Sequence, residues 1–141
     1  MAATDTIRVK WREDGSCTTL ARMTARDATG EWTGVAGEGN WLKQADLSAI
    51  TCAIFDLDSA TPSTALSTPT VTIATAIQDT PVTNGKIWAE DSIGYNFLHD
   101  LAATAFPTGG RNYRVEYKFT TTGSAVSWAV FEGPASEVRT S

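Results

Sequence analysis

The chain has 141 residues, of which 42% are hydrophobic and 19% charged, and a formal net charge of −5. This length suits one domain whose core needs neither a disulfide nor a metal. The acidic balance argues against a nucleic-acid partner, because binding to phosphates requires a basic surface. No apolar run is long enough to cross a membrane. Residues 1–10 lack the apolar core of a signal peptide, so we expect synthesis in a reducing cytoplasm.

Threonine, which occurs 22 times, combines with valine, isoleucine and aromatic residues to favour strands. Short apolar runs are separated by turn-forming residues, at spacings typical of a sandwich or barrel. Segments 44–48 and 100–105 are expected to form helical turns, and neither is long enough for a helix that covers a sheet. In chain order, the predicted strands span residues 7–11, 18–26, 49–57, 70–77, 93–98, 111–120 and 125–131.

The most regular of these strands is 111–120, where apolar and charged residues alternate with a period of two. Residues 121–124 then predict a hairpin loop, because they include a glycine that can adopt a positive φ. On the return strand, 125–131, we expect Trp128 and its alternate neighbours to face the core. The apolar side of the first strand consists of Tyr113, Val115, Tyr117 and Phe119, and its polar side of Arg114, Glu116 and Lys118.

These strands predict an all-β fold, an antiparallel immunoglobulin-like β-sandwich of about seven strands. A parallel α/β fold is disfavoured, because no segment could form its crossover helices. We assign the sandwich to residues 18–132. Residues 1–17 form an N-terminal arm that includes the first strand, and residues 133–141 form a C-terminal tail; both are polar and expected to be extended.

Residues that carry enzyme chemistry are scarce in this sequence. His99 is the sole histidine, which excludes the common multi-histidine metal sites, and we expect it to be a surface or turn residue at the end of a strand. Cys17 and Cys52 are too few for a disulfide framework; Cys52 is expected to be buried, and a bridge between the two is left open. The chain is therefore predicted to be non-enzymatic, without cofactor or metal. A small enzyme would need two carboxylates to converge from among Asp56, Asp58, Glu90, Asp91 and Asp100.

Two further segments have an incomplete resemblance to binding loops. Residues 34–40 are rich in glycine, but the Gly-Lys-Ser/Thr ending of a phosphate loop is missing, so we expect a flexible loop. Asp56 and Asp58 have the spacing that begins many calcium loops, without the glycine and the distal glutamate that complete them. An acidic turn is the expected structure there, with calcium binding as the alternative.

Tryptophans and a local basic cluster are the candidate binding residues. Trp32 and Trp41 flank the glycine-rich segment, and exposed aromatic rings stack on sugars or anchor protein interfaces. Both rings could instead pack back onto the loop. Together with Trp88 they also allow a carbohydrate-binding module as an alternative. The candidate interaction residues are Trp11, Trp32, Trp41, Arg8, Lys10 and Arg12.

Three parts of the sequence resemble a known family. Residues 106–119 (FPTGGRNYRVEYKF) precede a Thr-Thr-Gly turn, residues 47–50 (LSAI) lead into residues 53–56 (AIFD), and residues 94–97 (GYNF) lie before the Pro-Gly turn. This layout, which covers about residues 18–132, resembles the immunoglobulin-like domains of tailed-bacteriophage virion proteins.

The resemblance implies a non-enzymatic structural protein located in the virion. The expected function is a capsid decoration or cement protein that binds the major capsid protein, and the alternative is a tail, neck or baseplate accessory protein that binds other tail proteins. A homo-oligomer is expected, since such proteins are often added to a shell as symmetric copies.

Overall fold

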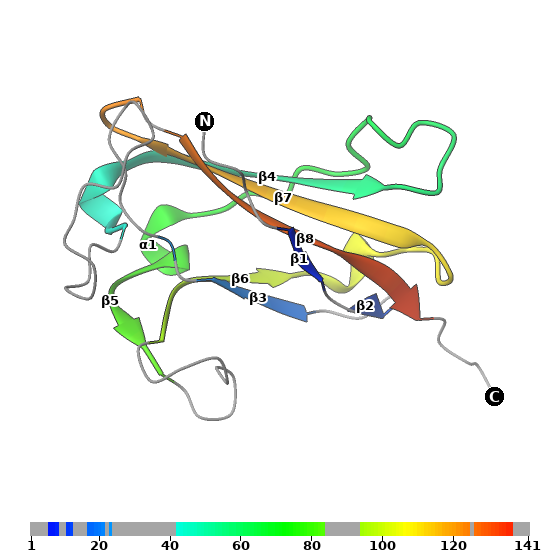
Figure 1. Cartoon of the computed structure of the whole chain (residues 1–141), viewed down its shortest axis with the longest axis horizontal. Helices are drawn as coiled ribbons and strands as arrows, with labels where there is room; N and C mark the ends of the chain where they lie inside the picture. Colours follow the sequence, from blue (N-terminus) through cyan, green and yellow to red (C-terminus); the bar gives the residue numbers. More distant parts are fainter. Residues whose placement is uncertain are drawn as a thin grey trace.

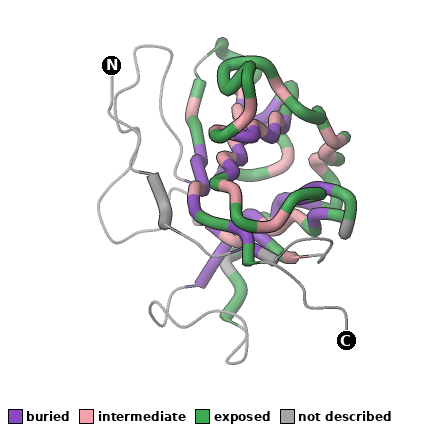
Figure 2. Tube along the Cα trace, turned by 90° about the vertical axis from the view of Figure 1, so that its right-hand side faces the viewer, coloured by how far each residue is buried: buried purple, intermediate pink, exposed green. Residues whose placement is uncertain are grey.

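The computed structural model of the chain consists of two β-sheets packed face to face (Figure 1). Among the described residues, six strands have five or more residues, and two shorter ones lie near the N-terminus. Along the longer strands, buried and more exposed positions alternate (Figure 2). No helix among the described residues is long and apolar enough to cross a membrane. The residues that the structure describes are 6–8, 11–12, 17–21, 23, 42–83, 94–124 and 126–136.

The first sheet has the strand order β1-β8-β7-β4. Its three long strands are β4 (Leu47–Asp56), β7 (Asn112–Thr121) and β8 (Val126–Ser136), and each is antiparallel to its neighbour. β7 lies in the centre and alternates strictly, so its apolar side is covered by the second sheet. This central pair of strands confirms the predicted hairpin.

The N-terminal strands β1 (Thr6–Arg8) and β2 (Trp11–Arg12) both pair with β8. Their pairing is parallel and keeps one register, with Thr6 opposite Val130 and Trp11 opposite Ala135. The predicted N-terminal strand is confirmed, but the first sheet is mixed rather than purely antiparallel. The predicted terminal arms also contribute to this sheet: β1 and β2 lie in residues 1–17, and β8 continues to residue 136.

The second sheet has the order β3-β6-β5 and is antiparallel. It contains β3 (Cys17–Ala21), β5 (Ile77–Val82) and β6 (Tyr95–Leu101). Pro81 lies within β5, which is possible because β5 is an edge strand and a proline there removes no ladder hydrogen bond. Pairing of β5 with β6 is irregular between Ile77 and Val82.

The core lies between the two sheets and is rich in aromatic rings. Tyr113, Val115, Tyr117 and Phe119 of β7 are fully buried. From β6, the ring of Phe97 meets those of Tyr117 and Phe119 edge-on, with centroids 4.8 Å and 5.0 Å apart. Such pairs contribute about 0.5–1.5 kcal/mol each beyond the area they bury. The predicted core side of β7 is therefore confirmed.

The shorter apolar runs place their residues in the core as the period of two predicts. On β4, Ile50, Cys52 and Ile54 are buried. On β3, Ala21 is buried, and the same side continues to Met23. These burial patterns confirm the predicted strand at 49–57 and the first part of the one at 18–26, where β3 spans residues 17–21. Residues 22 and 24–26 of that prediction lie outside the described residues.

The predicted orientation of β8 is wrong. The last paired positions of the hairpin, Thr120 and Val126, are separated by five residues rather than by the four of the predicted loop. Because side chains alternate along a strand, one additional loop residue exchanges the two sides of the return strand. Trp128 therefore points outward and is 41% exposed, whereas Ala129 and Phe131 are buried in the core.

The predicted strand at 70–77 is also wrong. Thr70 makes only an isolated bridge to Thr51, Ile73–Ala76 form one helical turn (α1), and β5 begins at Ile77. Ile73 and Ile77 are four residues apart, a spacing that fits both a helical face and one side of a strand. Periodicity alone could not separate the two in so short a segment.

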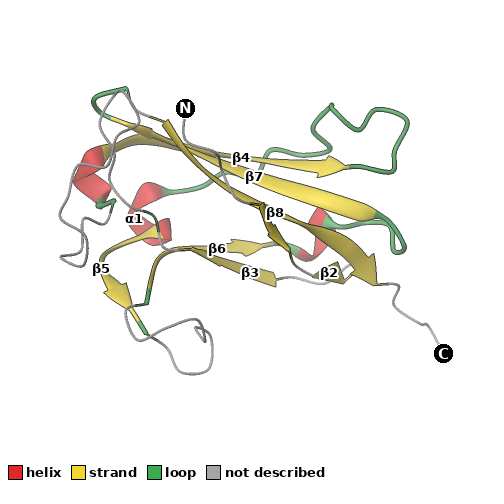
Figure 3. Cartoon of the chain, in the orientation of Figure 1, coloured by secondary structure: helices red, strands yellow, loops and turns green. Residues whose placement is uncertain are grey.

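The two predicted helical turns are confirmed as short 3-10 helices (Figure 3). The first, η1 (Gln44–Asp46), immediately precedes β4. The second, η2 (Ala103–Ala105), lies in the connection from β6 to β7. Both connect strands, and neither covers a sheet, in agreement with an all-β architecture.

Candidate functional site

Trp11, a predicted interaction residue, belongs to the core. It is 5% exposed, and its Nε1 donates a hydrogen bond to the backbone oxygen of Tyr113 at 3.2 Å. Its ring stacks on Phe106 with centroids 4.4 Å apart. An interaction through an exposed indole ring is thus the wrong role for this residue, because both its apolar surface and its donor are already used inside the chain.

The structure describes less of the other predicted interaction residues than of Trp11. Arg8 and Arg12 lie in β1 and β2, and the structure places their backbone without describing their side chains. Lys10, Trp32 and Trp41 lie outside the described residues, as does Trp88, which the carbohydrate-binding alternative also uses. Their roles stay predictions from the sequence.

The described residues on either side of segment 24–41 are joined by a buried side chain, Asn96. This residue is fully buried, and its Oδ1 accepts a hydrogen bond from the backbone nitrogen of Met23 at 2.6 Å. Its Nδ2 donates to the backbone oxygens of Met23 and Leu42 at 2.9 Å and 3.0 Å. Asn96 thereby fixes the start and the end of this segment beside each other. A single polar residue within an apolar strand was the only sequence signal for this role.

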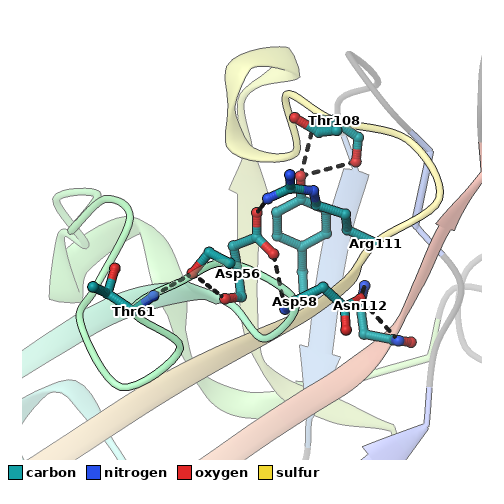
Figure 4. Close-up of polar contacts among 8 residues, drawn as sticks. Asp56, Asp58, Thr61, Thr108, Arg111 and Asn112 are labelled. Carbon is teal, nitrogen blue, oxygen red and sulfur yellow. Dashed lines mark hydrogen bonds and ion pairs between the residues drawn. The ribbon is translucent and has the colours of Figure 1, made fainter.

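The carboxylates of Asp56 and Asp58 have partners within the chain (Figure 4). Asp56 Oδ2 accepts a hydrogen bond from Arg111 Nη1 at 2.8 Å. Asp58 Oδ2 accepts from the backbone and side-chain nitrogens of Asn112 at 2.7 Å and 3.2 Å. Within the described ranges, no three His, Cys, Asp or Glu side chains form a group that could hold a metal ion. The cluster joins the end of β4 to the start of β7, and its geometry gives the calcium alternative no support.

His99 lies within β6, is partly buried and faces the space between the sheets, so its prediction as a surface or turn residue is wrong. Its Nδ1 is 2.9 Å from the hydroxyl of Tyr117, which is 2.9 Å from Thr19 Oγ1. These hydrogen bonds connect β3 and β6 to β7 of the other sheet. Burial lowers the pKa of His99, because the charged imidazolium loses hydration there. The side chain acts as a neutral partner between the sheets.

Both thiols are free, so the bridge that the sequence left open is not formed. Burial raises the pKa of Cys17 to about 11 and that of Cys52 to about 12. A thiol attacks substrates as the thiolate, and at neutral pH both groups are protonated. They behave as small apolar residues that pack against the core.

The outward side of the β7–β8 hairpin combines exposed apolar and charged residues. Val126 is 40% and Trp128 is 41% exposed. The Lys118 Nζ lies 5.8 Å from the centroid of the Trp128 ring, within the range of a cation–π interaction. Beside them, Arg114 Nε and Nη1 bind Glu116 and Glu132 at 2.6 Å and 3.4 Å. We call this surface the Trp128 face; it consists of Arg114, Glu116, Lys118, Val126, Trp128 and Glu132. Val130 lies on the same side of β8 but is only 4% exposed.

The Trp128 face was missed because the predicted return strand ended at residue 131. In the structure β8 continues to residue 136, and the inward side runs on through Gly133 and Ala135, which are buried. The side that carries Trp128 continues into Glu132, a charged residue. A longer window, which includes the charge at position 132, would have identified the outward side of this strand.

Most polar side chains described above are engaged in bonds within the chain, whereas the Trp128 face presents apolar surface to solvent. That arrangement suits binding better than acid–base or nucleophilic chemistry. No family model, no curated protein and no solved structure matches this chain. Any proposal of function therefore rests on the residues and geometry of the chain and on the sequence resemblance described above.

Proposed function

We propose that the chain is a non-enzymatic structural protein of a phage virion, built as an immunoglobulin-type β-sandwich. The observation that carries the fold assignment is the strand order. In immunoglobulin domains, strands B, E and D belong to one sheet and C, F and G to the other. Here β3, β6 and β5 stand in the order B-E-D, and β4, β7 and β8 in the order C-F-G.

The connection from β6 to β7 supplies a second supporting feature. Near the start of strand F, immunoglobulin domains have a tyrosine whose hydroxyl bonds to the backbone a few residues upstream. Tyr113 lies at this place in β7, and its hydroxyl donates to the Thr108 oxygen and accepts from the Thr108 nitrogen, both at 2.9 Å. The chain departs from antibody domains in having no disulfide between its sheets, since Cys17 and Cys52 are free.

The virion assignment comes from the sequence resemblance, because a fold does not determine a function. The quoted motifs fall on β4, on β6 and on the segment from Phe106 through β7. These are the elements that give the sandwich its strand order. A capsid decoration protein that binds the major capsid protein is the preferred function, and a tail, neck or baseplate accessory protein is the alternative.

The non-enzymatic character is supported by the bonds of the candidate catalytic groups. The Asp56 carboxylate is bound by Arg111, the Asp58 carboxylate by Asn112, and the His99 imidazole by Tyr117. A general acid or base must be free to reach a substrate proton. Each of these groups instead stabilises the packing of one part of the sandwich on another.

Mass spectrometry of gradient-purified particles tests this proposal. For a decoration protein, we expect the chain in a fixed ratio to the major capsid protein; for a tail component, we expect it in a few copies per particle. Recombinant chain added to particles that lack it should restore that ratio. Absence from purified particles would contradict the virion assignment in both forms.

Carbohydrate binding is the second candidate, and the exposure of Trp128 favours it. An indole ring on the outer side of a sheet can stack on a sugar ring. If this is the function, a glycan array should retain the wild-type chain and lose Trp128→Ala, or the double variant Trp32→Ala/Trp41→Ala, while Leu66→Ala serves as an exposed control. An array that retains none of these proteins rejects the candidate.

A further inference from the structure

The Trp128 face contains two large hydrophobic residues at adjacent outward positions of one strand. Among the described residues, four large hydrophobic side chains have exposures of 38–47%, and Val126 and Trp128 are two of them. The other two, Leu66 and Val82, lie in the β4–α1 connection and at the end of β5. Exposed apolar residues that are adjacent on one surface mark interaction sites, whereas scattered ones do not.

The two cationic residues of this face, Arg114 and Lys118, differ in the groups that surround them. Arg114 is bound by two carboxylates of its own chain, and the hydrogen bond with Glu116 raises its pKa. For Lys118, no ion pair occurs with any residue whose structure is described, and its ammonium group lies over the Trp128 ring. A cation without a carboxylate beside an exposed indole is complementary to an acidic residue of a binding partner.

Pairing across the hairpin places these residues in rows. Arg114 lies opposite Glu132, Glu116 opposite Val130, and Lys118 opposite Trp128. The acidic residue Glu116 is thus in the row next to Lys118 on the same strand and on the same face. A face that carries a cation and an anion in neighbouring rows can be complementary to itself, which is the requirement for an interface with two-fold symmetry.

We propose that the Trp128 face is the contact surface between two copies of this chain. The two-fold axis lies parallel to the sheet and crosses β7 and β8 between the row of Glu116 and the row of Lys118. This operation places Lys118 opposite Glu116 of the partner subunit, and the ion pair occurs twice. Each Trp128 ring comes to lie over the partner subunit's β8 at the row of Val130. Because the Val130 side chain is only 4% exposed, the apolar burial comes from the two indoles.

The size of the face predicts a weak dimer. β7 has 10 residues, and the two strands of this face, spaced by about 4.8 Å, make a surface of roughly 300 Å² per subunit. A stable interface of standard size buries about 800 Å² per partner. We therefore expect a reversible dimer with a dissociation constant of roughly 100–500 µM. The proposal depends on this surface alone and not on the virion assignment.

Sedimentation velocity of the full chain, at concentrations from about 1 to about 500 µM, tests the proposal. The wild type should shift from monomer to dimer, and Trp128→Ser should weaken dimerisation by more than about tenfold. Leu66→Ser is the matched control, because Leu66 is 47% exposed away from this face, and it should dimerise like the wild type. Circular dichroism checks that each variant is folded.

The charge pair gives a test that does not depend on the indole. Lys118→Glu and Glu116→Lys should each weaken the dimer, because each brings like charges together across the axis. The double variant with both substitutions should restore dimerisation. Failure of the double variant to restore it, or a wild type that stays monomeric throughout, would overturn the proposal. A monomer whose attachment to virions is lost in Trp128→Ser would assign the face to another virion protein and would equally overturn the dimer.

Discussion

The side chains of Trp11 and Trp128 lie on opposite sides of the same sheet, and they differ in exposure and in the groups that they contact. Trp11 lies on β2 beside β8, is 5% exposed, stacks on Phe106 and donates its indole hydrogen bond to the chain. Trp128 lies on β8 itself, is 41% exposed and contacts only the ammonium group of Lys118 among the interactions described. Trp11 lies opposite Ala135 of β8, which faces the core. Trp128 belongs to the other set of alternate β8 residues, which faces outward, because successive residues of a strand face opposite sides of the sheet.

The largest expected effect is a loss of stability when Trp11, the buried one of the two tryptophans, is replaced. Trp11→Ala should lower the free energy of unfolding by about 3–5 kcal/mol, because it leaves a cavity beside Phe106 and removes a buried hydrogen bond. Chemical denaturation followed by circular dichroism measures this loss. Trp11→Phe retains an aromatic ring and should lose about 1–2 kcal/mol. A loss below about 1 kcal/mol for Trp11→Ala would show that this side chain does not close the core.

A smaller effect is expected at the residue that accepts the Trp11 hydrogen bond. Tyr113→Phe retains the buried ring and removes both hydrogen bonds between the Tyr113 hydroxyl and Thr108. The free energy of unfolding should fall by about 1–2 kcal/mol, since each such bond contributes about 0.5–1.5 kcal/mol. Unchanged denaturation midpoints would contradict a structural role for this corner, and with it one support of the immunoglobulin-type assignment.

The free energy of unfolding should also depend on pH through His99, which faces the space between the sheets. Burial lowers its pKa in the folded chain, so the unfolded chain, with an ordinary pKa of about 6.5, takes up the proton first as pH falls. The free energy of unfolding should therefore decrease as pH falls from about 6.5 towards the folded pKa, and this contribution should be constant above about 7.5. The chain has one histidine, so His99→Gln isolates the effect. Parallel pH curves for the wild type and this variant would contradict it.

The smallest effect on stability is expected on the outward side. Trp128→Ala should change the free energy of unfolding by no more than about 0.5 kcal/mol at concentrations where the chain is monomeric, since it removes an exposed ring and one surface cation–π contact. Thermal denaturation at high dilution measures this. A loss comparable to that of Trp11→Ala would mean that Trp128 is part of the core.

The sequence predicted the roles of these two tryptophans in reverse, and the reason is physical. Trp128 has apolar alternate neighbours, so its side of β8 resembles a core side until Glu132 is included. Trp11 follows the basic residues Arg8 and Lys10, and this short polar context gave no indication that its ring enters the core. Periodicity identified the strands of the hairpin, but which side of the return strand is buried depends on the length of the hairpin loop and on the neighbouring sheet.

Other features were predictable to different degrees. The alternation on β7 identified its buried residues, because every second position from Tyr113 to Phe119 is apolar. The helical turn at Ile73–Ala76 was not predictable, since its apolar spacing also fits a strand. The hydrogen bonds of Asn96 and His99 join residues that are distant in the sequence, and no local pattern encodes such contacts.

The register of the β7–β8 hairpin tests most directly whether Trp128 faces outward. Nuclear Overhauser contacts between the backbone protons of the two strands report which residues lie opposite each other. We expect contacts that place Tyr117 opposite Ala129 and Lys118 opposite Trp128. Contacts that place Tyr117 opposite Trp128 would turn the indole into the core, and they would contradict both the Trp128 face and the dimer proposed from it.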